Sequence, residues 1–432
     1  MNLFKKRHSQ LIQDSATPSA ARVKSTLRIG VAEGAAASTV VTMGDHVIVP
    51  FGLFLKASSF QIGLLLAVPN LMAALLQLLS PAMIRLTGSR KGALQLCTFL
   101  NGLAWIGVLL VPILFDSFQV WGLLVFAVLA VVFFNLPNAA WGSWISDLVP
   151  NVKRGSYLGI RGSLSSLIAA CTFLFSGFVL DRFHNSLLTG FVIVFAIMAA
   201  ARFLSTMFFT MMHEPPMERS KVVVPNIFQF LRSVPGSNLG RFMLYSAGFY
   251  FAVNLYSAFF PVYVLQELNY NYTTYVGLVI IVPLAGTVSM LFWGPLADKR
   301  GNMIVLKIGA WLMPLIPVMW TLSHNIFYLI FVQAFGGVIW GGMALCSLNF
   351  VYESSTAENR TTNISYFYVL NGVALFLGAT ISGIIAPHLP HVLGSEFLAL
   401  FFLSGAVRVL IALIFIPGLK ETRKTAQDPV SG

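Results

Sequence analysis

The chain has 432 residues, of which 57% are hydrophobic and only 10% are charged, and its mean hydropathy is +0.80. This composition excludes a soluble protein of this size, so the lipid bilayer must be the solvent for most of the chain. The net charge of +12 would fit a nucleic-acid partner, but the placement of the charges explains it better, and we expect no nucleic acid.

Residues 1–24 are polar and basic without a continuous apolar core, which predicts a cytoplasmic tail rather than a cleaved signal peptide. Apolar stretches follow, each with the ~20 residues that a helix needs to cross the hydrocarbon core. The sequence therefore predicts an all-α integral membrane protein with 12 transmembrane helices. These cover residues 29–55, 60–84, 92–114, 119–144, 157–180, 186–212, 239–265, 273–296, 304–322, 325–351, 364–386 and 395–417.

The first predicted helix carries polar residues near its centre, where an ionisable group is costly and marks a functional site by default. Thr42 is the midpoint of this helix, and Asp45 lies about 4.5 Å beyond it. A carboxyl group buried in hydrocarbon takes up a proton more readily than one in water, and imidazole titrates near neutral pH. We predict that Asp45 binds a coupling proton or cation with His46 beside it; alternatively, Asp45 is a satisfied polar residue facing an outer vestibule.

Glu33 lies nine residues before Thr42 on the same predicted helix, about 13 Å from the midplane. This depth is near the headgroup region. We expect Glu33 to lie at the interface and to pair with Arg161 or Arg202.

Two charged turns divide the chain at related positions. The second and third helices are joined by the sequence PAMIRLTG over residues 81–88, and the eighth and ninth by GPLADKRGN over 294–302. Glycines allow a tight reversal at both. Gly301 minus Gly88 is 213 residues, close to half of the chain, which indicates two repeated halves.

A second pair of motifs supports the repeat. Asp147 precedes Arg154 by seven residues, Glu353 precedes Arg360 by seven, and the offset between the pairs is 353 − 147 = 206. Two prolines break the sixth helix and open the long internal loop. We predict two pseudo-symmetric six-helix bundles: an N-terminal bundle over 25–212, a cytoplasmic linker over 213–238, a C-terminal bundle over 239–417 and a cytoplasmic tail over 418–432.

Most Lys and Arg residues fall in the predicted tails and in the loops that follow even-numbered helices, and only Lys56 and Arg182 fall on the other side. This asymmetry predicts that both termini are cytoplasmic, in an inner or plasma membrane or one derived from it. The three cysteines lie inside apolar spans, so no disulfide framework is expected. No soluble segment has a nucleophile–base pair, a phosphate loop or metal-ligand spacing, so we expect no enzyme and no cofactor.

Histidines gather in the predicted outer half of the chain. His388 and His391, with Glu396 nearby, offer imidazole and carboxylate ligands that suit a transition metal. Pro390 disturbs a regular helical pair, and chance clustering is the alternative explanation.

The turn over 294–302 resembles the signature loop of the major facilitator superfamily, G-x-L-A-D-x-x-G, and the acidic-to-Arg pairs resemble the cytoplasmic gate motif of its sugar-porter-like members. The resemblance covers residues 25–417. It implies alternating access, in which two bundles rock around a central site and cytoplasmic ion pairs hold one gate closed. The implied gate residues are Arg85, Asp147, Arg154, Asp298, Arg300, Glu353 and Arg360.

The resemblance also implies that helices 1, 4, 7 and 10 line the central cavity. Their aromatic and amide residues suit a polar, partly apolar organic solute, with helix packing as the alternative role for each. With a neighbouring residue of helix 11, the predicted cavity residues are Thr42, Asn135, Asn138, Trp141, Tyr250, Asn254, Trp340 and Asn371.

Two departures from the family pattern leave the subfamily open. Arg85 replaces the acidic residue of the first-half loop, so we expect it to contact Asp147 or Glu353 instead. Helix 5 lacks both the glycine-rich run of drug/proton antiporters and the glutamine pattern of sugar porters.

Three functions compete at this stage. The first is a secondary active transporter of a small solute, coupled to a proton or cation. The second is a transporter of a transition-metal ion, such as iron, or of a metal chelate. The third is a non-transporting membrane sensor or assembly scaffold. We expect a monomer in the lipid bilayer with a small-molecule or ion substrate.

Overall fold

The computed structural model describes residues 20–148, 151–215, 237–355, 360–392, 395 and 397–421. Most of the two predicted tails and most of the predicted linker lie outside these ranges. Three predicted site residues, Asp45, Arg154 and Arg360, have a described backbone, but their side chains lie outside the described part.

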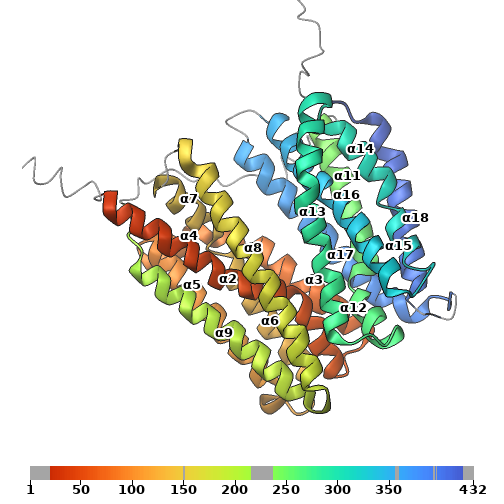
Figure 1. Ribbon diagram of the computed structural model, residues 1–432, viewed down its shortest axis with the longest axis horizontal. Coiled ribbons are helices and arrows are strands. Elements are labelled where there is room, and N and C mark those ends of the chain that lie inside the picture. Colours follow the sequence, from red (N-terminus) through yellow and green to blue (C-terminus); the bar gives the residue numbers. More distant parts are fainter. Residues whose placement is uncertain are drawn as a thin grey trace, which may run out of the picture. The chain divides into compact units, whose positions relative to one another are not determined.

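Helices make up nearly all of the described chain (Figure 1), as the long apolar stretches predict. In the first half they are α2 (Ala20–Phe54), α3 (Ser59–Leu76), α4 (Ser80–Thr87), α5 (Arg90–Leu114), α6 (Gln119–Asn135), α7 (Asn138–Leu148), α8 (Asn151–Arg182) and α9 (Leu187–Met211). In the second half they are α11 (Asn238–Ser257), α12 (Phe260–Val262), the π-helix η4 (Tyr263–Glu267), α13 (Tyr272–Arg300), α14 (Asn302–Leu312), α15 (Leu315–Met319), α16 (Ile326–Glu353), α17 (Arg360–Ile385) and α18 (Leu398–Phe415).

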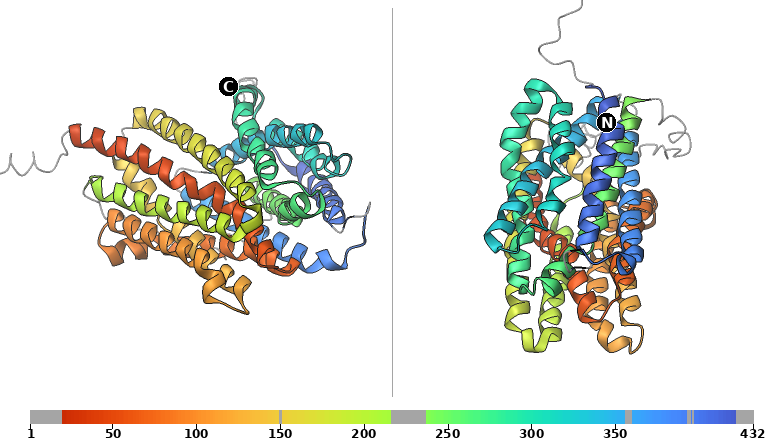
Figure 2. Two further views of the ribbon diagram at one scale, coloured as in Figure 1. Left: turned by 60° about the horizontal axis from the view of Figure 1, so that its bottom comes forward. Right: turned by 90° about the vertical axis from the view of Figure 1, so that its right-hand side faces the viewer.

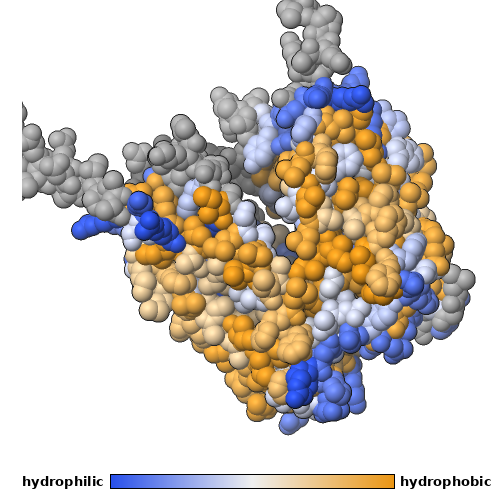
Figure 3. Space-filling view, viewed as in Figure 1, coloured by the Kyte–Doolittle hydropathy of each residue, from blue (hydrophilic) through white to orange (hydrophobic). Residues whose placement is uncertain are grey.

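Among the described residues, 11 helices are long and apolar enough to cross a membrane, and the number is 12 when the two parts of α2, bent by 44° between Gly44 and His46, are counted as one span. The predicted number of transmembrane helices is thereby confirmed. Hydrophobic side chains cover most of the visible flanks in Figure 3, and hydrophilic ones gather at the helix ends. Phe292 and Phe327 are 72% and 78% exposed, as expected of side chains that contact lipid tails.

Proline explains where predicted helices are interrupted. Pro137 separates α6 from α7 within the single helix predicted over 119–144, because proline lacks the N–H that would continue the hydrogen-bond ladder. Pro261 lies in α12, directly after the break that follows α11, and Pro314 lies in the break between α14 and α15.

The described helices form two compact units. Unit 1 comprises residues 1–45, 76–176 and 188–223, and unit 2 comprises 46–75, 177–187 and 224–432. The chain therefore passes from one unit to the other at the bend of α2, between Asp45 and His46. In unit 2, α13 lies along α16, and α11 lies along α17 and α18 (Figure 2).

Unit 2 combines segments of both sequence halves. The reason is an apolar cluster in which Val49, Ile62 and Ala67 of the first half pack with Phe259 and Leu400 of the second. All five side chains are nearly inaccessible to solvent.

Candidate functional site

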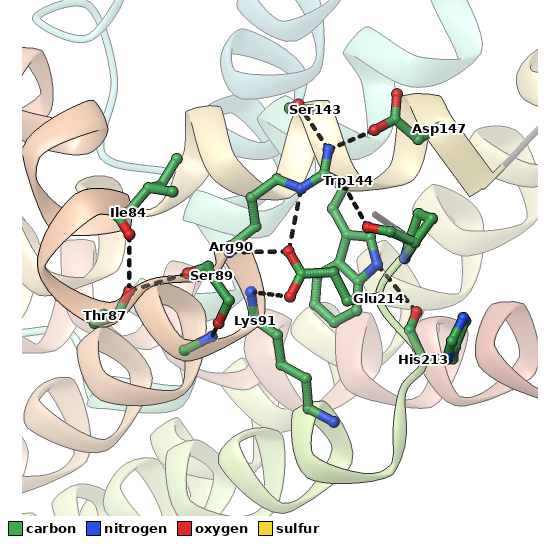
Figure 4. Close-up of polar contacts among 12 residues, drawn as sticks. Ile84, Thr87, Ser89, Arg90, Lys91, Ser143, Trp144, Asp147, His213 and Glu214 are labelled. Atoms are coloured by element: carbon green, nitrogen blue, oxygen red, sulfur yellow. Dashed lines mark hydrogen bonds and ion pairs between the residues drawn. The ribbon is translucent and has the colours of Figure 1, made fainter. Parts of the chain in front are cut away.

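A buried arginine organises one end of unit 1 (Figure 4). The Arg90 side chain is only 1% exposed, and its guanidinium contacts Asp147 at 2.5 Å, Ser143 at 3.0 Å and Glu214 at 3.3 Å. Such charge-assisted bonds are stronger than neutral ones, and they satisfy a charge that would otherwise be costly to bury.

The sequence places Arg90 at the start of α5. Ser89 caps this helix by accepting a hydrogen bond from the Gly92 N–H. The Glu214 carboxylate accepts from the N–H groups of Arg90 and Lys91 at 2.9 and 3.2 Å, which neutralises the positive end of the helix dipole. We call Arg90, Asp147 and Glu214 the first clasp.

A corresponding second clasp in unit 2 is formed by Asn302, Glu353 and Glu421. The Asn302 amide donates to Glu353 at 2.8 Å, and the Met303 N–H at the start of α14 donates to Glu421 at 2.8 Å. Gly301, with a φ of +87°, precedes this helix, and a side chain there would collide with the Glu421 carboxylate. Only glycine fits both the backbone conformation and the close approach.

The two clasps are related by the sequence repeat. Glu353 follows Asp147 by 206 residues, and Glu421 follows Glu214 by 421 − 214 = 207. Asn302 follows Arg90 by 212, so a neutral amide occupies the place of the buried cation. The structure therefore contains the predicted repeat, with a charged clasp in the first half and a partly neutral one in the second.

The predicted gate residues are distributed unevenly. Asp147 pairs with Arg90 rather than with the expected Arg85, which is exposed on α4. Glu353 belongs to the second clasp, and Asp298 and Arg300 are exposed at the end of α13. The sequence did not single out Arg90 as the partner of Asp147, because alignment of the two turns on Gly88 selects Arg85, which takes the place of the acidic residue. The signal for Arg90 was the preceding Ser89, a residue type that often caps a helix start.

A second ionic cluster lies inside unit 1. Glu33 of α2 is 3% exposed; its carboxylate accepts from the Arg161 guanidinium at 2.8 Å and from the Ser205 hydroxyl at 2.8 Å. Arg161 also donates to the Gly30 carbonyl at 3.0 Å and stacks on the Trp141 ring, 4.4 Å from its centroid. The predicted pairing of Glu33 with Arg161 is confirmed.

Arg202 of α9 and Arg408 of α18 are buried at equivalent repeat positions, since 408 − 202 = 206. Arg202 donates to the Thr98 hydroxyl at 3.3 Å and lies over the Phe134 ring, while Arg408 donates to the Met313 carbonyl at 2.8 Å. Neither makes an ion pair within 4.0 Å in the described ranges. A buried arginine without a carboxylate is costly, so these positions are candidates for function.

The predicted coupling residues lie at the bend of α2. The backbone at Asp45 joins the two parts of the bent span. His46 is half-buried, and its carbonyl accepts from the Tyr275 hydroxyl at 3.2 Å. Thr42 is half-buried one turn earlier, in unit 1.

The other predicted cavity residues fall into two groups. In unit 1, Asn135 and Asn138 bond to each other at 3.3 Å across the α6–α7 break, beside the half-buried Trp141. In unit 2, Tyr250 meets the Trp340 ring edge-on at 5.7 Å, and the Asn254 amide donates to the Tyr250 carbonyl. Asn371, a buried residue of α17, accepts from the Ser246 hydroxyl at 3.0 Å.

Of the predicted metal ligands, the structure describes the two histidines. His388 and His391 are both exposed, and the His388 ring bonds to the Ile384 carbonyl at 3.1 Å. Glu396 lies outside the described residues. Throughout the part of the chain that the structure describes, no three His, Cys, Asp or Glu side chains are close enough to hold a metal ion.

A close-packed seam joins the two sequence halves within unit 2. Asp181, at the end of α8, accepts from the N–H groups of Tyr272 and Thr273 at 2.8 Å each, and so caps α13. Gly63 of α3 faces α17 so closely that a Cβ there would lie 2.5 Å from the Ala379 carbonyl oxygen. We call these contacts, with the Tyr275–His46 bond, the seam.

These features define a multi-pass helical membrane protein built from two repeated halves, with an ionic clasp at a helix start in the first half, a partly neutral one in the second, and a few buried charges. The sequence profile of the Major Facilitator Superfamily matches residues 30–322 and 242–431. The chain belongs to this superfamily, whose members are secondary transporters rather than enzymes.

Solved structures share the fold at low identity. A variant of the nucleoside transporter NupG has a TM-score of 0.73 at 12% identity, covering 91% of this chain and all of that one. A D-xylose–proton symporter has a TM-score of 0.71 at 14% identity, covering 93% and 98%.

Similarity to curated proteins is more limited. The quinolone resistance protein NorA of Staphylococcus aureus is 24% identical over 165 residues, which is 38% of this chain and 40% of NorA. The match thus spans less than half of either protein.

Proposed function

We propose that this chain moves a small solute by alternating access and couples its transport to a proton or cation at Asp45. The observation that carries the proposal is the 44° bend of α2 between Gly44 and His46, which interrupts a membrane-spanning helix at an acidic residue. Interrupted helices are where transporters build ion and substrate sites.

The buried contacts of Glu33 support Asp45 as the coupling group. Of the two acidic residues within the span of α2, Glu33 is already engaged by Arg161 and Ser205. Its negative charge is therefore already balanced by Arg161 in this structure. The second acid, Asp45, lies at the bend of α2, at one of the points where the chain passes between the two units.

Replacing Asp45 with asparagine is expected to abolish uphill accumulation and to spare solute exchange, because the amide cannot carry a proton. A thermal-shift screen of purified protein identifies a solute, since binding raises apparent stability. Proteoliposomes containing a pH-sensitive dye then report proton movement when that solute is added. Uphill accumulation by the Asp45→Asn protein at the wild-type level would exclude Asp45 as the coupling group.

The seam must separate when access changes sides, and Asp181 is its charged contact. Replacing Asp181 with alanine should increase amide hydrogen exchange at the start of α13 about tenfold, because Tyr272 and Thr273 lose a charged acceptor. Exchange measured by mass spectrometry tests this. The matched control is Asp116→Ala, which removes an exposed acid in the loop between α5 and α6; equal exchange in both variants would contradict the role of Asp181.

We further propose that both termini are cytoplasmic, which puts the clasps on the cytoplasmic side and the seam on the outer side. The distribution of Lys and Arg supports this orientation. The exposure of His388 and His391 gives the metal-transport hypothesis no support from geometry.

A further inference from the structure

We propose that the solute is a small organic anion whose carboxylate binds the Arg161 guanidinium in place of Glu33. This inference rests on the proposed transport function and names its substrate class. It is carried by the charge balance and by the unpaired hydrogen-bond donors around Arg161.

Among the described side chains around Glu33, the positive charges outnumber the negative ones. Arg161 and Arg202 face a single described carboxylate, Glu33, which is close enough to Arg202 to interact electrostatically. Arg202 is 3% exposed, and its Nε has no hydrogen-bond partner among the described residues. A monoanion bound here would balance two guanidiniums with two negative charges, which lowers the cost of burying them.

Several hydrogen-bond donors nearby also lack acceptors. The Trp141 indole N–H, in the ring that stacks on Arg161, is buried without a partner in the described ranges. The same holds for the hydroxyls of Tyr157 and Ser165, which lie four residues before and after Arg161 on one face of α8. Buried donors without acceptors are uncommon in proteins, and an anion offers several acceptor atoms at once.

The contacts of Arg161 allow exchange between two acidic partners. Its side chain is 19% exposed, whereas that of Glu33 is only 4% exposed, so a solute can reach the guanidinium without first displacing the carboxylate. The Trp141 ring and the Gly30 carbonyl hold the guanidinium in place. A planar guanidinium binds a carboxylate through two parallel hydrogen bonds, which an ammonium cannot do.

The test compares three probes of the same size and different charge: benzoate, benzamide and benzylammonium. Their effects on the apparent melting temperature of purified full-length protein are measured at pH 7 and constant ionic strength, with inorganic phosphate as a fourth probe. Benzoate should raise the melting temperature in a saturable manner, and the other three probes should not. Stabilisation by phosphate, benzamide or benzylammonium but not by benzoate would overturn the proposal.

Variants distinguish two roles of Arg161: binding of the solute carboxylate, and a purely structural ion pair with Glu33. Glu33→Gln should lower the dissociation constant for benzoate about tenfold, because the guanidinium loses its internal competitor. Adding Arg161→Gln should remove benzoate binding, while adding Arg161→Lys should weaken it without removing it. The Glu33→Gln/Arg161→Gln protein has no unpaired charge at this pair. If its melting curve stays cooperative, the loss of benzoate binding is not a consequence of misfolding.

The surface variant Lys299→Gln, which removes an exposed cation that belongs neither to the predicted gate nor to a clasp, should leave benzoate binding unchanged. If benzoate binds neither the wild type nor the Glu33→Gln protein, the organic-anion inference fails. Proton movement driven by a neutral or cationic solute in proteoliposomes would then still support the proposed transport function, so the two failures are distinguishable.

Discussion

Replacing Arg90 with alanine is expected to destabilise the protein by about 3 kcal/mol, whereas Arg85→Ala should change its stability by less than about 0.5 kcal/mol. Arg90 is 1% exposed and contacts two carboxylates and a hydroxyl. Its loss leaves a cavity and leaves Glu214, whose side chain is 15% exposed, without its cationic partner. The apparent melting temperature in detergent measures the difference.

A graded series makes this prediction specific. Asp147→Asn should lower the free energy of unfolding much less than Arg90→Ala does. The Asp147 side chain is 45% exposed, so water can solvate the groups that lose the ionic contact. Glu214→Gln should be intermediate, since an amide oxygen still accepts from the start of α5. Equal effects of Arg85→Ala and Arg90→Ala would mean that the clasp does not stabilise unit 1.

The clasps also show what the sequence alone could reveal. The Gly88–Gly301 and Asp147–Glu353 offsets predicted the repeat, and the structure adds the Glu214–Glu421 pair at nearly the same offset. That third pair was present in the sequence. It was not recognised because these acids contact helix starts more than 100 residues away, and such contacts have no local pattern.

Burial was the property that could not be inferred. Arg85 and Arg90 are five residues apart and chemically identical, but one is exposed and the other is enclosed by α7 and the segment after α9. Hydropathy locates a membrane-spanning helix, but it does not tell whether a cation near the helix end faces the protein interior or solvent. Glu33 was placed correctly with Arg161 because few cations fall within the predicted helices or near their ends, which limits the possible partners of a buried acid.

Replacing Glu33 with alanine is expected to destabilise the protein by about 3–5 kcal/mol, because Arg161 and Arg202 would then face no described carboxylate inside unit 1. The Ser205 hydroxyl would lose its acceptor as well. If this loss arises from an unpaired charge, removing the charge should reverse much of it.

A double-mutant cycle tests that reasoning. Glu33→Ala with Arg161→Gln should be more stable than Glu33→Ala alone, with a coupling energy of about 2–3 kcal/mol between the two positions. Glu33→Ala with Arg85→Gln is the control and should show additive effects, since Arg85 is exposed on α4. Additivity at Glu33 and Arg161, measured by thermal unfolding in the same detergent, would show that the 2.8 Å contact contributes little to stability. In the organic-anion inference, the Arg161 guanidinium exchanges the Glu33 carboxylate for that of the solute. The coupling energy between Glu33 and Arg161 is therefore the interaction free energy that the bound solute must supply instead.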